Sequence, residues 1–335
     1  MRICVLGSGT WGTALAQVLT DNGHQVTIYG NNQEQIDDIS KHHQNRQYFG
    51  SEITLSPSIK ATTSLSQALD GKSIVLVAVP SNAIRAVLSE VRPLLKSRKY
   101  FINTAKGIEA GTEKRMSQVF EDVIPQELRH PLVSLIGPSH AEEVILRMVT
   151  AITATSHDLR TARHIQSIFA NNYFRVYTNN DEIGAEIGVA MKNAIAIASG
   201  ALAGLGYGDN ARAALVTRGL HEMVNFGTRL GGKLKTYLGL TGLGDLMVTC
   251  NSLHSRNFVA GYKIGKDDSA SDFWATNKAT VEGIYATKVI YRMGKEMDID
   301  LPIINAVYAV LYEDKRPSEL LANLMVRPLK DESDE

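Results

Sequence analysis

The chain has 335 residues, of which 44% are hydrophobic and 21% charged, an ordinary composition for a globular protein. Its 35 Lys and Arg residues balance its 35 Asp and Glu residues, which excludes the excess of positive charge expected of a general nucleic-acid binder. At about 100–200 residues per domain, the length predicts two domains.

The cysteines and the apolar segments favour a cytoplasmic protein. Cys4 and Cys250 are the two cysteines and lie far apart, so they match neither a disulfide framework nor a CxxC metal site. The apolar run Ile3–Leu6 is too short for a secretory signal. The apolar stretch 188–206 contains Lys192 and several glycines, so we expect a buried helix there and no integral membrane segment.

The first half of the chain alternates short β-rich runs with helical patterns. The run Ser73–Val79 is apolar throughout and ends at Pro80, which is typical of a strand covered on both faces. This alternation predicts an α/β domain with a doubly wound, mostly parallel sheet. We expect strands at 3–6, 26–29, 73–79, 100–103, 133–136 and 151–154, and helices at 11–22, 81–91, 113–122 and 139–146.

The second half lacks strand-like runs beyond about Tyr177 and has long helical patterns instead. These patterns predict an all-α domain at 181–335, following an α/β domain at 1–180. The expected helices lie at 181–204, 210–230, 256–265, 283–296 and 302–313.

The sequence Gly7-Ser8-Gly9-Thr10-Trp11-Gly12 has the form GxGxxG, directly after the first strand and at the start of the first helix. In this context Gly7 allows the tight turn, Gly9 lets a pyrophosphate approach the backbone, and Gly12 lets helix and strand pack closely. The helix N-terminus then offers free N–H groups to the phosphates. The motif predicts a dinucleotide site; the alternative is a structural glycine turn.

The end of the second expected strand does not distinguish NAD from NADP. An acidic residue there would favour the ribose 2′-hydroxyl of NAD, but the sequence reads Tyr29-Gly30-Asn31-Asn32. Asn31 can hydrogen-bond a hydroxyl or a phosphate, and Lys41 and Arg46 lie close enough in sequence to meet a 2′-phosphate.

Lys192 is the one charged residue in the apolar helical stretch 188–198. A lysine on such a face loses hydration, which favours the neutral amine and suits it to proton transfer. The alternative is a side chain that extends along the helix to solvent.

Two further segments follow strands, at the edge of the sheet where open α/β proteins bind ligands. Lys106 lies three residues after the strand 100–103 and could meet an anion or a carbonyl, or simply be a solvated lysine. Gly137 and Ser139 follow the strand 133–136; the Ser139 hydroxyl could cap a helix, bind an anion or do both. His140 is more simply read as a packed or surface histidine.

The second half has two polar segments of its own. Asp245 ends a glycine-rich turn and could orient a catalytic lysine or cap a helix. Ser255, Arg256 and Asn257 begin a helix and could bind a phosphate, for which the Arg fork is suited, or form a surface cap. The sequence has no HExxH or HxxxH pattern, and we expect no metal site.

Eight blocks in order identify a resemblance that covers nearly the whole chain. They are 7–16 (GSGTWGTALA), 103–109 (NTAKGIE), 137–143 (GPSHAEE), 189–200 (VAMKNAIAIASG), 210–220 (NARAALVTRGL), 239–250 (GLTGLGDLMVTC), 255–257 (SRN) and 281–283 (VEG). The chain resembles the bacterial NAD(P)-dependent glycerol-3-phosphate dehydrogenases. The resemblance implies a Rossmann domain followed by a helical domain of the 6-phosphogluconate-dehydrogenase-like type. It also implies NAD(H) or NADP(H) as cofactor and a homodimer.

The resemblance further implies reversible reduction of dihydroxyacetone phosphate to sn-glycerol 3-phosphate, a precursor of phospholipids. Lys192 matches the family's proton acceptor and donor, with Lys106 and Asp245 beside it in the reaction. The positions that match the substrate site are Lys106, Gly137, Ser139, Lys192, Asp245, Ser255, Arg256 and Asn257. The positions that match the cofactor site, together with the glycines of the first turn, are Thr10, Trp11, Asn31, Lys106, Ala141, Arg256, Thr280 and Glu282. Ser139 stands where the family often has Thr and Asn31 where it often has His or Arg, so the choice between NAD and NADP stays open.

Overall fold

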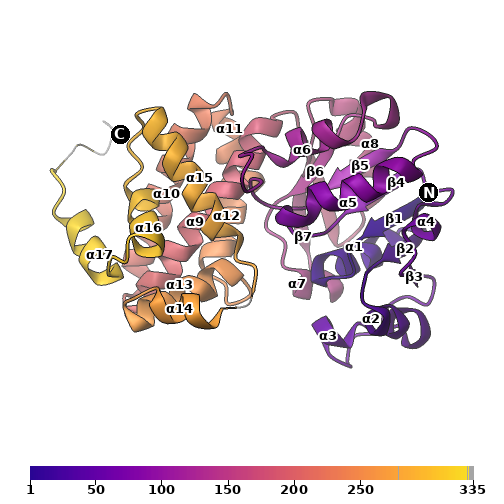
Figure 1. Cartoon of the computed structure of the whole chain (residues 1–335), viewed down its shortest axis with the longest axis horizontal. Helices are drawn as coiled ribbons and strands as arrows, with labels where there is room; N and C mark the ends of the chain where they lie inside the picture. The colour runs from indigo at the N-terminus through magenta and orange to yellow at the C-terminus, as the bar shows by residue number, and fades with distance from the viewer. Residues whose placement is uncertain (278, 330, 332–335) are drawn as a thin grey trace. The chain divides into compact units, whose positions relative to one another are not determined.

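The computed structural model describes residues 1–277, 279–329 and 331, shown as a ribbon in Figure 1. The contacts between residues divide the chain into two compact units, Met1–Glu182 and Ile183–Glu335. The first unit contains the sheet, and the second consists of helices.

The first unit is built on an eight-stranded sheet in the order β3-β2-β1-β4-β5-β6-β7-β8. Neighbouring strands are parallel except for β6 and β7, which are antiparallel. This topology confirms the doubly wound, mostly parallel sheet. The strands are β1 (Arg2–Leu6), β2 (Gln25–Tyr29), β3 (Lys60–Thr62), β4 (Ile74–Val77), β5 (Tyr100–Asn103), β6 (Val133–Ile136), β7 (Thr150–Thr155) and β8 (Phe174–Asn179).

The two edge strands, β3 and β8, were not expected from the sequence. β3 has only three residues, too few for a periodic pattern. In β8, Phe174 and Val176 are buried whereas Arg175 and Tyr177 are exposed, because an edge strand packs on one face only. A search for continuous apolar runs therefore finds the strands that are buried on both faces and misses β8.

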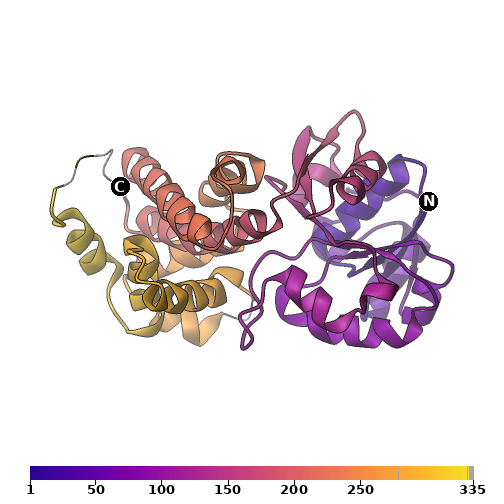
Figure 2. The ribbon, with the colours of Figure 1, turned by 90° about the horizontal axis from the view of Figure 1, so that it is seen from above.

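Helices cover both faces of the sheet, as Figure 2 shows. On one face, Ile3 and Val5 of β1 belong to a core formed with α1 (Thr10–Asp21), α7 (Ala141–Ile145) and α8 (Leu159–Phe169). On the other face, the alternate residues of β1 pack in a second core. The helices of that core are α4 (Leu65–Leu69), α5 (Ile84–Val91) and α6 (Met116–Val123). Three short segments join β2 to β3: α2 (Gln33–Asp37), the π-helical turn η1 (Asp38–His42) and α3 (Arg46–Phe49).

The second unit is helical over its described residues, as the sequence predicts. Its long central helix, α9, is long and apolar enough to cross a membrane by length and composition, but 78% of its most apolar window is buried within the protein. An all-round apolar surface is what a helix enclosed by other helices requires. The helices are α9 (Glu182–Gly204), α10 (Asp209–Arg229), α11 (Leu234–Tyr237), α12 (Asp245–Cys250), α13 (Arg256–Asp267), α14 (Ser271–Thr276), α15 (Glu282–Glu296), α16 (Pro302–Tyr312) and α17 (Pro317–Met325).

The helices α9 and α13 touch through their backbones. A methyl group added to Gly200 of α9 would lie 2.0 Å from the carbonyl oxygen of Phe258. One added to Gly261 of α13 would lie 2.0 Å from the carbonyl oxygen of Ile197. This close contact fixes the position of α9, which carries Lys192, against α13, which begins at Arg256.

Candidate functional site

The glycine loop forms a tight strand-to-helix turn at the carboxyl end of β1. Gly7 has φ +114°, and a Cβ there would lie 2.5 Å from the carbonyl oxygen of Ala78. A Cβ on Gly12 would lie 2.1 Å from the carbonyl oxygen of Gly7, so the helix can approach the strand only without it. The space beside Gly9, where a Cβ would point, is open for 4 Å, and no side chain caps the start of α1. These are the features that a bound pyrophosphate needs.

Trp11 provides a second indication of a ligand at this turn. Its indole Nε1 is buried and lacks a hydrogen-bond partner among the described residues. A buried donor without a partner is uncommon in folded proteins, because it loses its bonds to water without replacement. A hydrogen-bond acceptor on a bound dinucleotide would satisfy it. The turn thus fits the cofactor expected from the sequence.

The glycine loop is supported by buried polar residues that the sequence analysis missed. The Asn45 side chain donates to the carbonyl oxygen of Ser8 at 2.9 Å and to Thr13 Oγ1 at 2.8 Å. Gln35 accepts a hydrogen bond from Ser8 Oγ at 2.6 Å and donates to the Ser8 carbonyl oxygen at 2.7 Å. Both side chains lie in a polar segment far along the chain, and no local pattern marks them as buried.

The residues after β2 bear on the choice between NAD and NADP. Asn31 is exposed, and the Asn32 side chain is used to cap α2 by accepting from the N–H of Gln35 at 3.2 Å. Lys41 is paired with Asp37 at 2.9 Å. Thus Lys41, one of the two cations considered for a 2′-phosphate, already has a carboxylate partner.

Arg46, the other cation, is held more firmly. Asp38 accepts from its Nε at 2.8 Å and from its backbone N–H at 2.9 Å. The hydrogen bonds from Arg46 hold the pKa of Asp38 below its usual range. Binding of a 2′-phosphate by Arg46 would have to compete with this carboxylate.

Lys106, Gly137 and Ser139 come together at the carboxyl ends of β5 and β6. Lys106 Nζ donates to the carbonyl oxygen of Gly137 at 3.4 Å, and Ser139 Oγ donates to the same oxygen at 3.0 Å. Ser139 does not cap α7: the residue before this helix is His140, whose side chain makes no capping bond either. Ala141, predicted to contact the cofactor, is the first residue of α7 and is buried. The helix-cap alternative for Ser139 is therefore wrong.

The second unit contains a buried charged cluster around Lys192. Lys192 is only 3% exposed and Asp245 only 1%, so the amino group does not extend to solvent. Lys192 Nζ donates to Asp245 Oδ1 and to Thr249 Oγ1, the latter at 2.7 Å. Thr249 in turn donates to the backbone carbonyl oxygen of Asp245 at 2.6 Å. Because an unpaired buried ammonium would be costly, this arrangement keeps a charged lysine in the core.

Thr249 is a site residue that the sequence analysis missed. It lies four residues after Asp245, one turn further along α12, and faces the same lysine. This spacing places two side chains on one helical face. The four-residue spacing of Asp245 and Thr249 could therefore be read from the segment Asp245–Cys250. It indicates a site only when Lys192 is known to lie opposite this helical face.

The start of α13 presents Arg256 together with two anchored neighbours. Ser255 Oγ accepts from the N–H of Phe258 at 3.2 Å and so is the helix cap, but it is also buried. Asn257 Oδ1 accepts from the N–H of Gly283 at 2.8 Å. The Arg256 side chain is exposed, and the described residues provide no ion-pair partner for it. Arg256 is thus available for an external anion.

The remaining predicted residues lie at the start of α15. Glu282 is its first residue, and its Oε2 accepts from Asn193 Nδ2 at 3.4 Å, one residue beyond Lys192. Thr280 lies two residues earlier and is partly buried. The second unit therefore brings Glu282 close to the helix of Lys192, and Gly283 close to Asn257.

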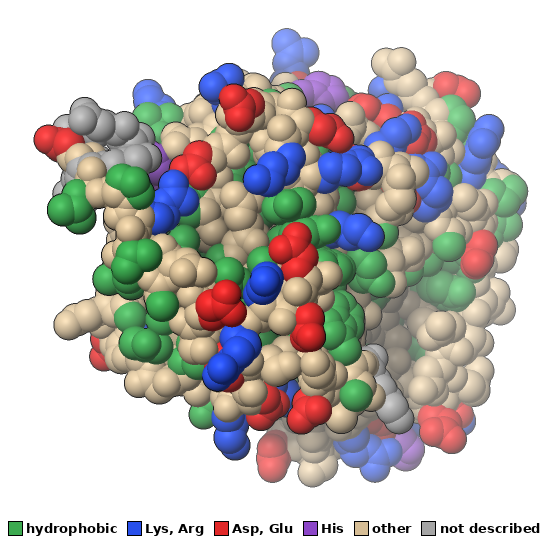
Figure 3. Space-filling view, turned by 60° about the vertical axis from the view of Figure 1, so that its left-hand side comes forward, with side chains coloured by type: hydrophobic (Ala, Val, Ile, Leu, Met, Phe, Trp, Pro, Cys, Tyr) green, Lys and Arg blue, Asp and Glu red, His purple; other side chains and the backbone are tan. Residues whose placement is uncertain are grey.

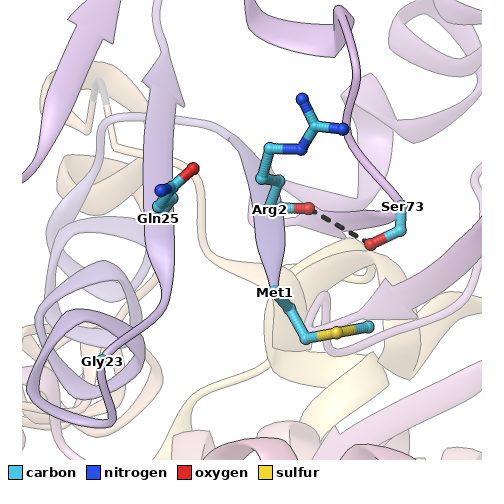
Figure 4. Close-up of a pocket in the computed structure, with 5 residues that line it drawn as sticks. All are labelled: Met1, Arg2, Gly23, Gln25 and Ser73. Atoms are coloured by element: carbon cyan, nitrogen blue, oxygen red, sulfur yellow. Dashed lines mark hydrogen bonds between the residues drawn. The ribbon is translucent and has the colours of Figure 1, made fainter.

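Two hollows in the structure lie away from these residues. One is lined by Met1, Arg2, Gly23, Gln25 and Ser73, where Ser73 Oγ contacts the Arg2 carbonyl oxygen at 3.4 Å (Figure 4). It lies at the amino ends of β1 and β2, opposite the glycine loop. The other is apolar and lies among α9, α10, α13, α16 and α17. Over the described residues, no group of three or more His, Cys, Asp or Glu side chains is placed to hold a metal ion.

Family models match both units. Residues 2–162 match the N-terminal model of NAD-dependent glycerol-3-phosphate dehydrogenase, and residues 181–322 match its C-terminal model. The chain belongs to this family. This confirms the resemblance identified from the eight sequence blocks, together with the fold class and the nicotinamide cofactor that it implies.

Relatives of this dehydrogenase family match along almost the whole chain. The glycerol-3-phosphate dehydrogenase (NAD(P)+) of Lacticaseibacillus paracasei is 47% identical over 99% of this chain and 97% of its own length. That of Staphylococcus epidermidis is 48% identical over 99% of both chains. The crystal structure of glycerol-3-phosphate dehydrogenase from Coxiella burnetii superposes with a TM-score of 0.89 at 32% identity, covering 97% of this chain and 99% of that one.

Proposed function

We propose that this protein catalyses the NAD(P)H-dependent, reversible reduction of dihydroxyacetone phosphate to sn-glycerol 3-phosphate and so supplies a precursor of phospholipids. The observation that carries the proposal is the buried Lys192, held by Asp245 and Thr249, in a chain of the glycerol-3-phosphate dehydrogenase family. The reaction needs a proton donor for the carbonyl oxygen, and this lysine is the buried cation fixed in place to serve.

The chemistry of Lys192 follows from its partners. The reduced nicotinamide, when bound, supplies a hydride to C2 of the substrate. The negative charge that develops on the carbonyl oxygen is neutralised by a proton from the Lys192 ammonium. Asp245 keeps the ammonium charged before the transfer, and Thr249 fixes its direction. In the reverse direction the amine accepts the proton from the hydroxyl group.

The substrate phosphate is bound by the start of α13. Arg256 has an exposed guanidinium, and two of its N–H groups can donate in parallel to two oxygens of a phosphate. Asn257 and Ser255 flank it, and the N-terminus of α13 adds favourable backbone dipoles. Lys106, with Gly137 and Ser139, also contributes to substrate binding, and Lys106 helps to polarise the carbonyl group.

The cofactor is bound by the glycine loop and by residues predicted from the family resemblance. Gly7, Gly9 and Gly12 shape the turn for the pyrophosphate, with Thr10 and Trp11 beside it. Asn31 binds the adenosine ribose. The other residues assigned to the cofactor are Lys106, Ala141, Arg256, Thr280 and Glu282.

The protein acts in the cytoplasm as a homodimer without bound nucleic acid. The family resemblance is the ground for the dimer, and sedimentation of the purified protein measures the association between copies directly. A mass equal to one chain over the working concentration range would reject the dimer.

Direct absorbance assays with two cofactors and two substrates test the activity. The protein is mixed with dihydroxyacetone phosphate and either NADH or NADPH, and the absorbance of the reduced cofactor is followed. We expect oxidation with the phosphorylated substrate and little with dihydroxyacetone, which lacks the phosphate held by Arg256. If neither cofactor is oxidised, the enzyme function is rejected in favour of a non-enzymatic nicotinamide-binding sensor.

A further inference from the structure

The loop that follows β5 carries Lys106 and is anchored on both sides of it. On the near side, Asn103 Oδ1 accepts from the N–H of Ala105 at 3.0 Å. Thr104 Oγ1 donates to the carbonyl oxygen of Val77 at 3.0 Å. These bonds tie the first part of the loop to the end of the sheet.

The far side of the loop is anchored by Glu109. Arg85 of α5 binds its carboxylate with both ends of the guanidinium fork, Nε to Oε1 at 2.9 Å and Nη2 to Oε2 at 2.8 Å. Thr112 Oγ1 also donates to this carboxylate. Glu109 is only 9% exposed, and the hydrogen bonds from Arg85 hold its pKa below its usual range.

The backbone around Glu109 folds back on itself. The N–H of Glu109 donates to the carbonyl oxygen of Lys114 at 2.9 Å, and Ile108 and Arg115 form an antiparallel bridge. The segment 108–115 is therefore a small hairpin. Its one buried charged side chain is fastened to α5, three residues after Lys106.

Two more ion pairs lie further out in the same cluster. Arg85 Nη2 also contacts Asp122 of α6 at 2.9 Å, and Lys114 Nζ contacts Asp122 at 2.5 Å. The side chains of Asp122 and Lys114 are 33% and 40% exposed, whereas the side chain of Glu109, taken without its backbone, is 11% exposed. Exposed pairs of this kind contribute little to stability. Arg85 is itself 37% exposed, but the Glu109 carboxylate is buried, receives both arms of the guanidinium and also accepts from Thr112. The Arg85–Glu109 pair is therefore the main fastening of the hairpin.

We infer that the Arg85–Glu109 pair is a positioning device for Lys106: it fixes the far end of the loop so that the lysine side chain is directed at the substrate. This inference rests on the proposed function of Lys106. A long lysine side chain on a loose loop samples many positions, and a misplacement of about 1 Å can cost on the order of 100-fold in rate. Clamping the backbone on both sides of Lys106 removes that freedom in advance.

The test is a double-mutant cycle in the full-length protein. We expect Arg85→Ala to lower kcat/KM for dihydroxyacetone phosphate by about 10–100-fold, and Arg85→Lys to recover part of the loss. Lys114→Ala removes only the Lys114–Asp122 pair, leaves both contacts of Arg85 in place, and is expected to stay close to wild type. In a Lys106→Ala background, Arg85→Ala is expected to have almost no further effect on kcat/KM, because the residue that it positions is already absent.

Hydrogen exchange gives an independent readout of the same contact. We expect Arg85→Ala to speed amide exchange in 105–115 while the strands of the sheet stay protected. Unchanged kcat/KM in Arg85→Ala, or losses from Arg85→Ala and Lys106→Ala that multiply fully, would overturn the inference. An inactive wild-type protein would instead reject the proposed function. Unchanged amide exchange in Arg85→Ala would reject the idea that Arg85 holds the hairpin 108–115 in place, whatever the activity.

Discussion

At the scale of single residues, the burial of Lys192 is the feature that most needs a reason. Removing one partner of a buried ion pair costs about 3–5 kcal/mol, because it leaves the other charge uncompensated. An apolar residue would pack in the core of α9 without any such risk. A lysine in this place, matched by Asp245 and Thr249, is explained by a chemical task better than by stability.

Replacement of Lys192 should separate chemistry from cofactor binding. We expect Lys192→Ala to lower kcat by about 10²–10⁴-fold, the usual contribution of a positioned acid or base. Steady-state kinetics measures kcat, and the fluorescence of bound NADH measures cofactor affinity, which we expect to change little. Thr249→Ser keeps the hydroxyl that contacts Lys192 and serves as the matched control. Normal turnover by Lys192→Ala would refute the role given to this lysine.

Arg256 should affect the substrate through its phosphate. Hydrogen bonds to charged groups contribute about 1.5–3 kcal/mol, so we expect Arg256→Ala to raise KM for dihydroxyacetone phosphate, or lower kcat/KM, by about 10–100-fold. Lys263→Ala removes another exposed cation of the same helix and controls for a general change of charge. Equal kinetics for Arg256→Ala and wild type would contradict the assignment.

At the scale of elements, backbone contact between helices decides where the site residues lie. Gly200 and Gly204 of α9 face Gly261 and Gly265 of α13, and a Cβ on any of the four would approach a carbonyl oxygen of the other helix to within about 2 Å. The start of α15 is equally close, since a Cβ on Gly283 would lie 2.5 Å from the Asn193 carbonyl oxygen. These contacts hold together the three helices that carry Lys192, Arg256 and Glu282.

Gly261→Ala tests this packing. The added methyl group has no space, so we expect a loss of about 1–3 kcal/mol in the free energy of unfolding, the usual cost of overpacking. The comparison variant is Gly208→Ala, where the space for a Cβ is open and φ is −84°. Chemical denaturation measures both, and equal stability of the two variants would show that the helices can separate without cost.

Glu222 of α10 is a buried carboxyl group that caps a different helix. It accepts from the N–H groups of Ile303 at 2.6 Å and Ile304 at 3.2 Å, in the first turn of α16. Burial raises the pKa of Glu222 to about 8, although the two N–H groups act in the opposite direction. The native protein therefore keeps a proton at pH values where the unfolded chain, with the ordinary pKa of 4.5, has lost it.

This difference predicts a pH dependence of stability. Between about pH 4.5 and pH 8 the native state binds more protons at Glu222 than the unfolded state does. The contribution of Glu222 to the free energy of unfolding therefore falls as pH rises through this range, and it is constant above about pH 8. We expect Glu222→Gln to remove this part of the slope, as measured by denaturation at several pH values. The exposed Glu319→Gln should leave the slope of the wild type. An identical slope in Glu222→Gln would contradict the assignment.

At the scale of the whole molecule, the chain has 35 positive and 35 negative residues, and where these charges lie matters as well as their sum. On the face shown in Figure 3, both signs of charge alternate with apolar side chains, and no continuous basic patch is seen. The cations that matter for the proposed chemistry are local: Lys192 has a buried carboxylate partner, whereas Arg256 is open to an external anion.

The charge distribution predicts weak interaction with polyanions. Non-specific nucleic-acid binding comes from many cations that displace counterions from phosphates. We expect the protein to leave the fluorescence anisotropy of a labelled DNA duplex unchanged at physiological salt. Binding that weakens steeply with added salt would show a basic surface on a face other than that of Figure 3.

Features made by neighbours in sequence could be predicted from the sequence. The turn Gly7–Gly12 needs a strand, three glycines and a helix start within a few residues, and the structure places them as expected. The buried strands β1 and β4 and the long helices α9 and α10 were equally clear, because continuous or periodic burial leaves its pattern in consecutive residues. The family resemblance likewise depends on ordered local blocks.

Only the tertiary structure decided which side chains meet. Lys192 and Asp245 are 53 residues apart, Arg85 and Glu109 are 24 apart, and Asn45 is 37 residues from Ser8. The choice between a buried and a solvated Lys192 was open from its own helix, because it depends on whether a carboxylate arrives from another. Local sequence determines the conformation of a segment, but the electrostatic energy of a charge is set by neighbours in space, and the fold alone supplies them.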